Sequence, residues 1–145
     1  MSAELFARYG TGEPEPESRL LAAGDLRVTL QDGNLRSLRF RGHEVLRAVA
    51  FLVRDRDWGT CAAEISALAV EEGASGFSVR YRARFTAPSA AHLDCDIEII
   101  GHEDGVAFAA DCVSDAGFET ARAGFVVLHP VMGVAGEPVT VRHSD

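Results

Sequence analysis

The chain has 145 residues, of which 47% are hydrophobic, 25% are charged and 8% are aromatic. This composition is that of an ordinary globular domain, and it excludes a collagen, a coiled coil or a wholly disordered chain. All 14 basic residues are Arg, against 22 Asp plus Glu, so that the formal net charge is −8. Such an acidic balance argues against nucleic-acid binding, which needs a net basic face to displace counterions.

The first 18 residues predict an arm outside the folded domain. Pro14 and Pro16 alternate with glutamates. Because proline lacks the backbone donor and fixes φ, this stretch suits neither a sheet interior nor a helix interior. We therefore expect an extended N-terminal arm over residues 1–18 and one folded domain over residues 19–145.

The sequence predicts no targeting signal and no membrane span. The N-terminus lacks a basic region followed by an apolar stretch, which a signal peptide requires. The purest apolar run is Ala48–Val53, far shorter than the roughly 20 residues that a membrane helix needs. We expect a cytoplasmic protein with no membrane partner.

From residue 19 onward the hydropathy alternates with a period of two, which is typical of strands with one buried face. Turn residues separate the alternating runs at the regular spacing of an antiparallel sandwich or barrel. We expect an all-β fold, an antiparallel β-sandwich of about nine or ten strands. A short helical turn is expected at Arg19–Ala23 or Phe118–Ala123. The predicted strands begin with the run Leu26–Gln31 and continue with Leu35–Arg41, Glu44–Trp58 (one long strand or two joined by a bulge), Ala63–Glu72, Phe77–Thr86, His92–Ile100, Val106–Ser114, Phe125–His129 and Val139–His143.

Two successive segments predict a ladder of opposite charges. If Phe77–Thr86 and His92–Ile100 pair as a hairpin, Arg84 lies opposite Asp94, Arg82 opposite Asp96, and Arg80 opposite Glu98. Opposite-charge cross-strand pairs contribute roughly 0.2–1 kcal/mol each, and a slip of one residue would turn all six charges into the core. A calcium site built from the three acidic residues is disfavoured, because the row of Arg opposite occupies their oxygens.

The three cysteines, Cys61, Cys95 and Cys112, indicate neither a disulfide framework nor a zinc site. They are odd in number and far apart, and no CxxC pair occurs. Cys95 and Cys112 fall on the apolar phase of predicted strands, so we interpret both as small core residues. This usage is consistent with the reducing cytosol.

The densest polar cluster is Arg54–Thr60, which follows the apolar run Ala48–Val53. An extended backbone would place Arg54, Arg56 and Trp58 on one face and the aspartates, including Asp57, on the other. Two guanidiniums beside an indole could bind a sugar acid by bidentate contacts and ring stacking. A covered interface with another domain or subunit is the favoured interpretation, and a solvated rim is the third.

His129 ends a core-like strand directly before Pro130. A lone histidine in this setting is more often a hydrogen-bonded core or rim residue than a base or ligand. No two histidines stand at metal-ligand spacing, and the run His143–Asp145 cannot be a hydrolytic triad because adjacent strand side chains point to opposite faces. We therefore expect no catalytic residue, no metal and no cofactor in this chain.

Charge is unevenly distributed along the sequence. Residues 26–60 contain seven Arg against four acidic residues, whereas residues 61–145 contain five Arg against 13. An all-Arg set suits fixed, bidentate pairing in ladders and interfaces better than loose surface solvation. The sequence thus predicts one Arg-rich surface, formed by the first half of the domain, on which a partner domain or sugar acid would sit.

Three stretches resemble known families. The segment Leu26–Leu46 resembles the opening strands of galactose-mutarotase-like and glycosidase-associated β-sandwiches. Val45–Thr60 and Gly124–His143 resemble the N-terminal region of the D-apionate lactonase family, and this resemblance runs from about Tyr9 to the C-terminus. It implies a mutarotase-like β-domain that precedes a larger TIM-barrel-like domain and a further β-domain, in an enzyme that hydrolyses a branched-sugar lactone.

The role that the resemblance implies is support of a catalytic domain. A barrel enzyme carries its chemistry on the loops at the C-terminal ends of its strands. We expect Arg54–Trp58 and His129–Gly136 to face that barrel, and the isolated chain to be inactive and to self-associate. Two alternatives stay open. One is a free-standing carbohydrate-binding or epimerase-like module that binds a sugar acid or lactone on Trp58, and the other is a structural or oligomerisation domain.

Overall fold

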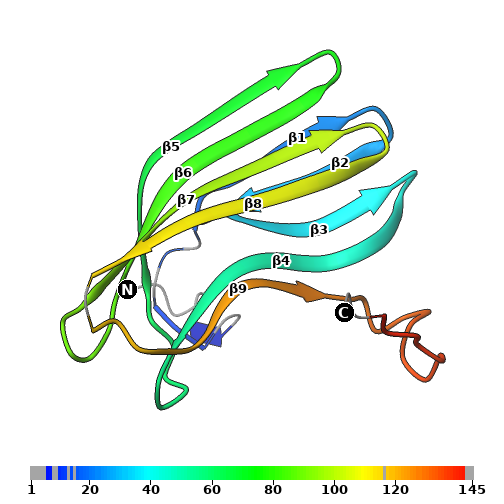
Figure 1. The fold of residues 1–145 in the computed structure, drawn as a ribbon. Coiled ribbons are helices and arrows are strands. Elements are labelled where there is room, and N and C mark those ends of the chain that lie inside the picture. The colour runs from blue at the N-terminus through cyan, green and yellow to red at the C-terminus, as the bar shows by residue number, and fades with distance from the viewer. Residues whose placement is uncertain (1–5, 8–9, 13, 15, 116, 143–145) are drawn as a thin grey trace.

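A computed structural model of the chain describes residues 6–7, 10–12, 14, 16–115 and 117–142. In these residues two antiparallel sheets lie face to face as a sandwich (Figure 1), which confirms the predicted all-β class. The described part contains nine strands: β1 (Ser18–Ala23), β2 (Leu26–Gln31), β3 (Asn34–Phe40), β4 (His43–Asp55), β5 (Ala63–Gly73), β6 (Gly76–Thr86), β7 (His92–His102), β8 (Gly105–Ser114) and β9 (Thr120–Leu128).

The chain builds the two sheets in sequence and then returns to the first. The five-stranded sheet has the order β1-β2-β3-β4-β9, and the four-stranded sheet has the order β5-β6-β7-β8. The loop after β4 crosses to the second sheet, and the loop after β8 crosses back, so that β9 becomes an edge strand beside β4. An ion pair between Arg19 on β1 and Glu72 on β5 links the two sheets.

The core lies between the sheets and follows from the period-two pattern. Val28, Val79 and Cys95 are fully buried on the inner faces. Phe51 and Phe125 approach to 5.1 Å between ring centroids, and the same cluster includes Phe85 and Phe108. Each fully buried aliphatic or aromatic side chain stabilises the fold by about 1.5–3 kcal/mol. The aromatic cluster therefore joins β4 and β9 of one sheet to β6 and β8 of the other.

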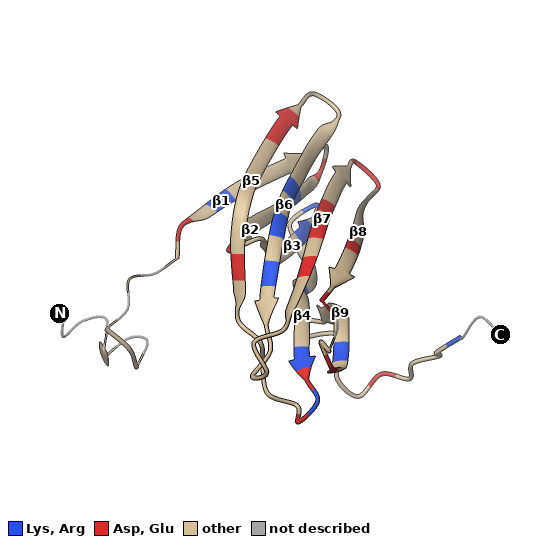
Figure 2. Cartoon of the chain, turned by 60° about the vertical axis from the view of Figure 1, so that its left-hand side comes forward, with Lys and Arg blue, Asp and Glu red and all other residues tan. Residues whose placement is uncertain are grey.

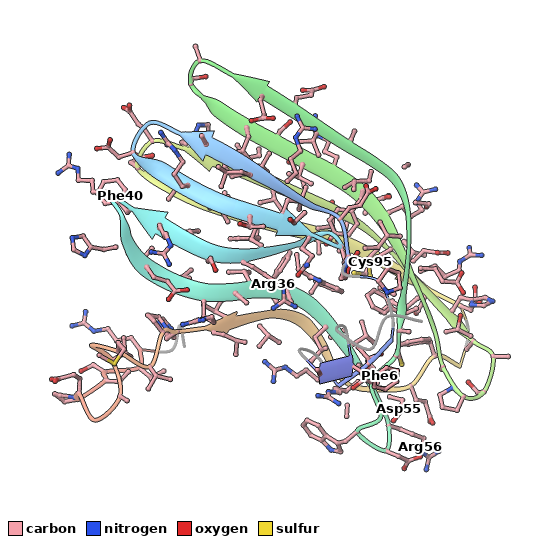
Figure 3. The ribbon with its side chains drawn as sticks, turned by 180° about the vertical axis from the view of Figure 1, so that it is seen from behind. Phe6, Arg36, Phe40, Asp55, Arg56 and Cys95 are labelled. Carbon is pink, nitrogen blue, oxygen red and sulfur yellow. The ribbon has the colours of Figure 1, made fainter. Side chains whose placement is uncertain are left out.

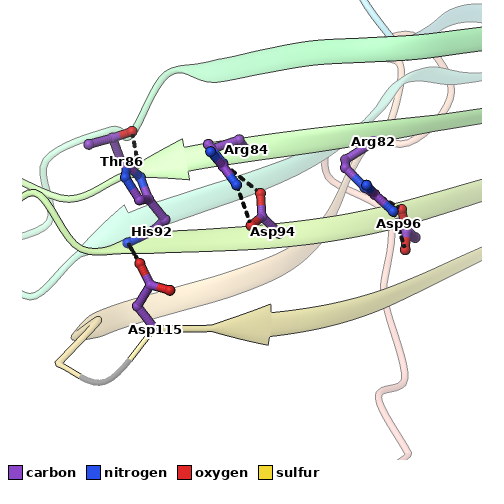
Figure 4. A network of polar contacts seen from close by, with 7 residues as sticks. All are labelled: Arg82, Arg84, Thr86, His92, Asp94, Asp96 and Asp115. Carbon is purple, nitrogen blue, oxygen red and sulfur yellow. Dashed lines mark hydrogen bonds and ion pairs between the residues drawn. The ribbon is translucent and has the colours of Figure 1, made fainter.

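The predicted charge ladder is confirmed on the outer face of the four-stranded sheet. The β6–β7 register places Arg80, Arg82 and Arg84 opposite the acidic residues Glu98, Asp96 and Asp94. The ion pairs measure 2.6 Å, 2.9 Å and 2.8 Å in that order. Figure 2 shows the row of basic residues on β6 beside the row of acidic residues on β7, and Figure 4 shows two of the pairs closely. No group of His, Cys, Asp and Glu in the described residues could hold a metal ion.

Some local predictions were wrong. The expected helical turn at Arg19–Ala23 is part of β1, and the alternative at Phe118–Ala123 overlaps the start of β9, because cross-strand pairing outweighs weak local propensity. Residues 139–142 form no strand, and the rest of the predicted run, with His143–Asp145, lies outside the described residues. Cys112 is exposed although it is the direct partner of buried Cys95, because β8 is an edge strand.

The residues before β1 contain no strand in the described positions, and the backbone at Phe6 and Ala7 is helical. β1 begins at Ser18, the last residue of the expected arm. No helix among the described residues is long and apolar enough to span a bilayer.

Candidate functional site

The loop between β4 and β5, residues 56–62, is built around the side chain of Asp55. This carboxylate is only 9% exposed, and its Oδ1 accepts the backbone N–H groups of Asp57 at 2.9 Å and Gly59 at 2.8 Å. The backbone closes the same turn, since the Trp58 N–H donates to the Asp55 carbonyl at 3.0 Å. Aspartate commonly organises a turn in this way. The predicted extension of the strand through Trp58 is therefore wrong, because β4 ends at Asp55.

The turn has a strained and crowded centre. A Cβ on Gly59 would lie 2.4 Å from Asp55 Oδ2, so that only glycine fits beside the carboxylate. Trp58 adopts a φ of 68° and its side chain is 63% exposed. A left-handed non-glycine residue costs on the order of 1–3 kcal/mol, which the surrounding hydrogen bonds must offset. The loop therefore fixes the backbone at Trp58 and leaves its indole exposed at one end of the sandwich.

Arg54 near the end of β4 and Arg56 in the loop are both engaged within the protein. Arg54 donates to the Trp58 carbonyl at 3.2 Å and to the Thr60 hydroxyl, while Arg56 pairs with Glu119 at 3.0 Å. Asp57 is exposed, and its carboxylate lies 3.9 Å from the Arg56 guanidinium. The two guanidiniums therefore do not stand free beside the indole, and the geometry predicted for sugar-acid binding is not formed.

His129 lies far from this loop. It is exposed directly after β9, and the buried Pro130 follows it. The β4–β9 register pairs Leu128 with Ala48 and Thr120 with Asp55. Seven residues along a strand span roughly 23 Å at about 3.3 Å per residue. Figure 3 likewise places Arg56 and Asp55 at the end of the sandwich opposite Phe40 and the C-terminal tail. The two patches that sequence analysis assigned to one surface therefore lie at opposite ends.

A Thr–His–Asp cluster at the β6–β7 loop resembles a catalytic triad but differs in its contacts. Thr86 Oγ1 lies 3.2 Å from His92 Nδ1, as Figure 4 shows. Asp115, however, accepts a hydrogen bond from the backbone N–H of His92 at 3.1 Å, and so does not orient the imidazole. A base needs a third group that fixes its ring and tautomer. The cluster therefore ties β8 to β7 and does not activate the threonine.

An apolar cleft opens between the sheets at the end where β9 stops. Its volume is about 340 Å³, and its walls include Leu38, Phe40 and Phe108, with Asp104 at the rim. Ligand sites combine apolar walls with several convergent polar groups. With one acidic residue among its lining residues, this cleft lacks such a set.

Sequence reasoning missed one feature of the outer face of the five-stranded sheet. Arg27 lies directly opposite Arg39, and Arg54 directly opposite Arg122. The excess of Arg in residues 26–60 was the available signal. The Arg54–Arg122 pair became visible only with the strand order, since β9 comes from far along the chain, whereas the Arg27–Arg39 pair lies within the β2–β3 hairpin.

The fold and its charged clusters define a β-sandwich domain, with one self-paired charged face and one Arg-rich face. The chain belongs to the family described as the D-apionate lactonase N-terminal domain, whose model matches residues 6–145. This confirms the resemblance of the sequence to the N-terminal region of D-apionate lactonases.

The chain is also similar to a curated relative named D-apionate lactonase from Brucella anthropi. The two are 50% identical over 145 residues, which cover 99% of this chain and 24% of the relative. The chain thus spans about a quarter of that protein's length. No solved structure matches the chain.

Proposed function

We propose that this chain is the accessory N-terminal β-sandwich of a sugar-lactone hydrolase and that it does not hydrolyse lactones by itself. The family membership and the relative that is about four times as long support this role. The structural observation that carries it is that three polar clusters of the described residues are used in contacts within the chain: the β6–β7 ladder, the Asp55 turn and the Arg56–Glu119 pair.

Lactone hydrolysis requires groups that these clusters do not offer. Water must add to the ring carbonyl while a base takes its proton, and hydrogen-bond donors must stabilise the oxyanion before the ring C–O bond breaks. His92, whose ring contacts the Thr86 hydroxyl, has its neighbouring carboxylate, Asp115, on its backbone N–H and not on its ring. We infer that the remaining three quarters of the enzyme supply the base, the donors and the substrate pocket.

The domain would act through contact surfaces. We propose that Trp58, Asp57 and the backbone turn held by Arg54 contact the rest of the enzyme at one end of the sandwich, together with Arg56. His129 would contact it at the other end, where the chain leaves β9. Trp58 supports this role best, since its indole is exposed although its backbone is fixed.

Several finer assignments also stay proposals. We propose an arm over residues 1–18 with a domain over 19–145, a mutarotase-like sandwich, and self-association of the isolated chain through its exposed apolar residues. We propose a cytoplasmic location, which the three free thiols support. Binding of a sugar acid or lactone to the chain itself remains the alternative function, with Trp58 as its platform.

A transplant experiment tests the proposed function. Residues 1–145 replace the matching quarter of the Brucella anthropi relative, and this chimera is compared with the isolated chain in an aldonolactone hydrolysis assay. We expect the chimera to hydrolyse the lactone and the isolated chain to match the buffer rate. Hydrolysis by the isolated chain would contradict the accessory role, and saturable lactone binding lost in Trp58→Ala would favour the alternative.

A further inference from the structure

The outer face of the five-stranded sheet carries arginines without acidic partners. Arg47 on this face pairs with Glu44 at 3.1 Å. Five other guanidiniums form no ion pair within the described part of the chain: Arg27, Arg36, Arg39, Arg54 and Arg122. We call these five residues the Arg face. They project outward because their strand neighbours, such as Val28 and Val53, are buried in the core.

The pairing within the Arg face opposes folding. Arg27 stands directly across from Arg39, and Arg54 directly across from Arg122. Like charges directly opposite each other on a sheet are destabilising. On the other sheet each of the three ladder arginines lies opposite an acidic residue. The protein as a whole has an excess of acidic residues, with a formal net charge of −8. Glu44, which pairs with Arg47 and lies opposite Arg39 across β3 and β4, is the one acidic residue that the described strands place among these arginines, so most of the positive charge on this face is not neutralised.

A flat apolar strip lies along β4 and β9 on the same face. Ala48 pairs with Leu128, Ala50 with Val126, and Leu52 with Gly124. Leu128 is 51% exposed. Each of the three pairs joins a larger side chain to an Ala or a Gly, so that the strip has a flat surface. An apolar strip flanked by arginines has the composition of a protein–protein interface, where Arg is enriched and contributes strongly to binding.

The path of the chain after β9 indicates which partner lies near this face. β9 is the edge strand of this sheet, and the tail that follows it leaves from the same sheet (Figure 1). The Brucella anthropi relative has about three quarters of its length outside the match, and the family is described as the N-terminal domain of the lactonase. A segment that continues from β9 is tethered beside the Arg face, so its effective concentration there is high.

We propose that the Arg face and its apolar strip dock against the larger part of the lactonase, through a surface that presents carboxylates. This inference rests on the proposed function. Carboxylates match the planar guanidinium in bidentate contacts, and they would relieve both Arg–Arg pairs at once. Arg36, labelled in Figure 3, lies on β3, opposite Ala48, and links the charged rim to the apolar strip.

Hydroxyl-radical footprinting of side chains tests the docking. The labelling of Leu52, Val126 and Leu128 is compared between the isolated 145-residue chain and the chimera described above. We expect it to fall several-fold in the chimera, while Val113 on the outer face of the other sheet keeps its labelling. Full labelling of the strip in an active chimera, or protection of Val113 instead, would overturn the docking proposal and leave the proposed function intact.

Charge variants supply the matched control. In the chimera, Arg36→Gln with Arg122→Gln is expected to restore labelling of the strip, whereas Arg80→Gln with Arg82→Gln on the self-paired face is expected to leave it protected. Equal effects of the two double variants would contradict the proposal. Footprinting the isolated chain against a large excess of a lactonase lacking its N-terminal quarter distinguishes docking from self-association, which would protect the strip without any partner.

If the chimera does not fold, the thermal stability of variants of the isolated chain tests the docking proposal. Because Arg122 faces Arg54 without an acidic partner, Arg122→Gln is expected to raise the Tm of the 145-residue chain or leave it unchanged. Arg82→Gln, which removes a ladder pair, is expected to lower it. A clear fall in Tm for Arg122→Gln would show that Arg122 serves the fold of the domain, and would overturn the proposal.

Discussion

The Arg84 guanidinium donates two hydrogen bonds of 2.8 Å to the Asp94 carboxylate, directly across the β6–β7 hairpin. These bonds lower the pKa of Asp94 below its ordinary value and raise that of Arg84. The charged forms of both groups are thus favoured by the folded state. The pair fixes the register of the hairpin and makes its stability depend on pH.

The sign of this pH dependence follows from the lowered pKa of Asp94. An aspartate titrates near pH 3.9 in the unfolded chain, so its stabilising contribution is complete well above about pH 4 and is lost as the pH falls through the lower folded value. We expect Asp94→Asn to be less stable than the wild type at about pH 7, and the difference to shrink below about pH 4. Urea unfolding of the two proteins across this pH range measures the difference in stability. A difference that stays constant into acid would contradict the pairing.

The turn held by Asp55 gives a second prediction. Asp55→Ala removes the acceptor of two partly buried backbone N–H groups, and should lower the free energy of unfolding by about 1–3 kcal/mol. Asp57→Ala in the same turn is the control, since its exposed side chain predicts a change within about 0.5 kcal/mol. Urea unfolding followed by the fluorescence of Trp58, the single tryptophan, reports both. Equal losses in the two variants would show that the carboxylate does not organise the loop.

Thiol reactivity gives a third prediction. Burial raises the pKa of Cys61 and Cys95, whereas Cys112 is exposed on an edge strand. Because the thiolate is the reactive form, an aromatic disulfide reagent should label Cys112 rapidly and the other two only on unfolding. Cys112→Ser should remove the rapid phase, and Cys61→Ser should leave it. Rapid labelling of all three thiols would contradict the packing of the sandwich.

The aromatic cluster between the sheets gives a fourth prediction. Phe85 is 2% exposed and its ring lies 5.9 Å from that of Phe51. Phe85→Ala should destabilise the chain by about 3–5 kcal/mol, because it leaves a cavity between the sheets. Val113→Ala on the outer face should change stability by no more than about 0.5 kcal/mol. Calorimetry of both variants tests the ranking, and a small loss for Phe85→Ala would place the core elsewhere.

The sequence predicted the fold wherever one face of a strand is buried and the next residue is charged. On β6 and β7 this alternation fixed the strands and their pairing, because any slip would bury charge. It predicted less well where the outcome depends on which strands form sheet edges. Cys112 has the pattern of a core residue, and only the position of β8 at an edge exposes it.

The sequence predicted which residues form the candidate site, but it did not predict their geometry. The cluster at Arg54–Trp58 was found, but the Asp55 side chain folds it into a turn, an outcome that period-two reasoning does not detect. The distance between this loop and His129 depends on the pairing of β9 with β4, two strands far apart in the sequence. The opposed pair Arg54–Arg122 depends on the same long-range pairing, whereas Arg27 and Arg39 lie opposite each other within the β2–β3 hairpin.

The central claim is that this domain supports a lactonase without carrying its chemistry. The most direct measurement is the rate of aldonolactone hydrolysis by the purified 145-residue chain, with His129→Ala and Asp57→Ala beside it. The predicted result is the buffer rate for all three proteins. Saturable turnover by the unmodified chain that is lost in either variant would contradict the claim.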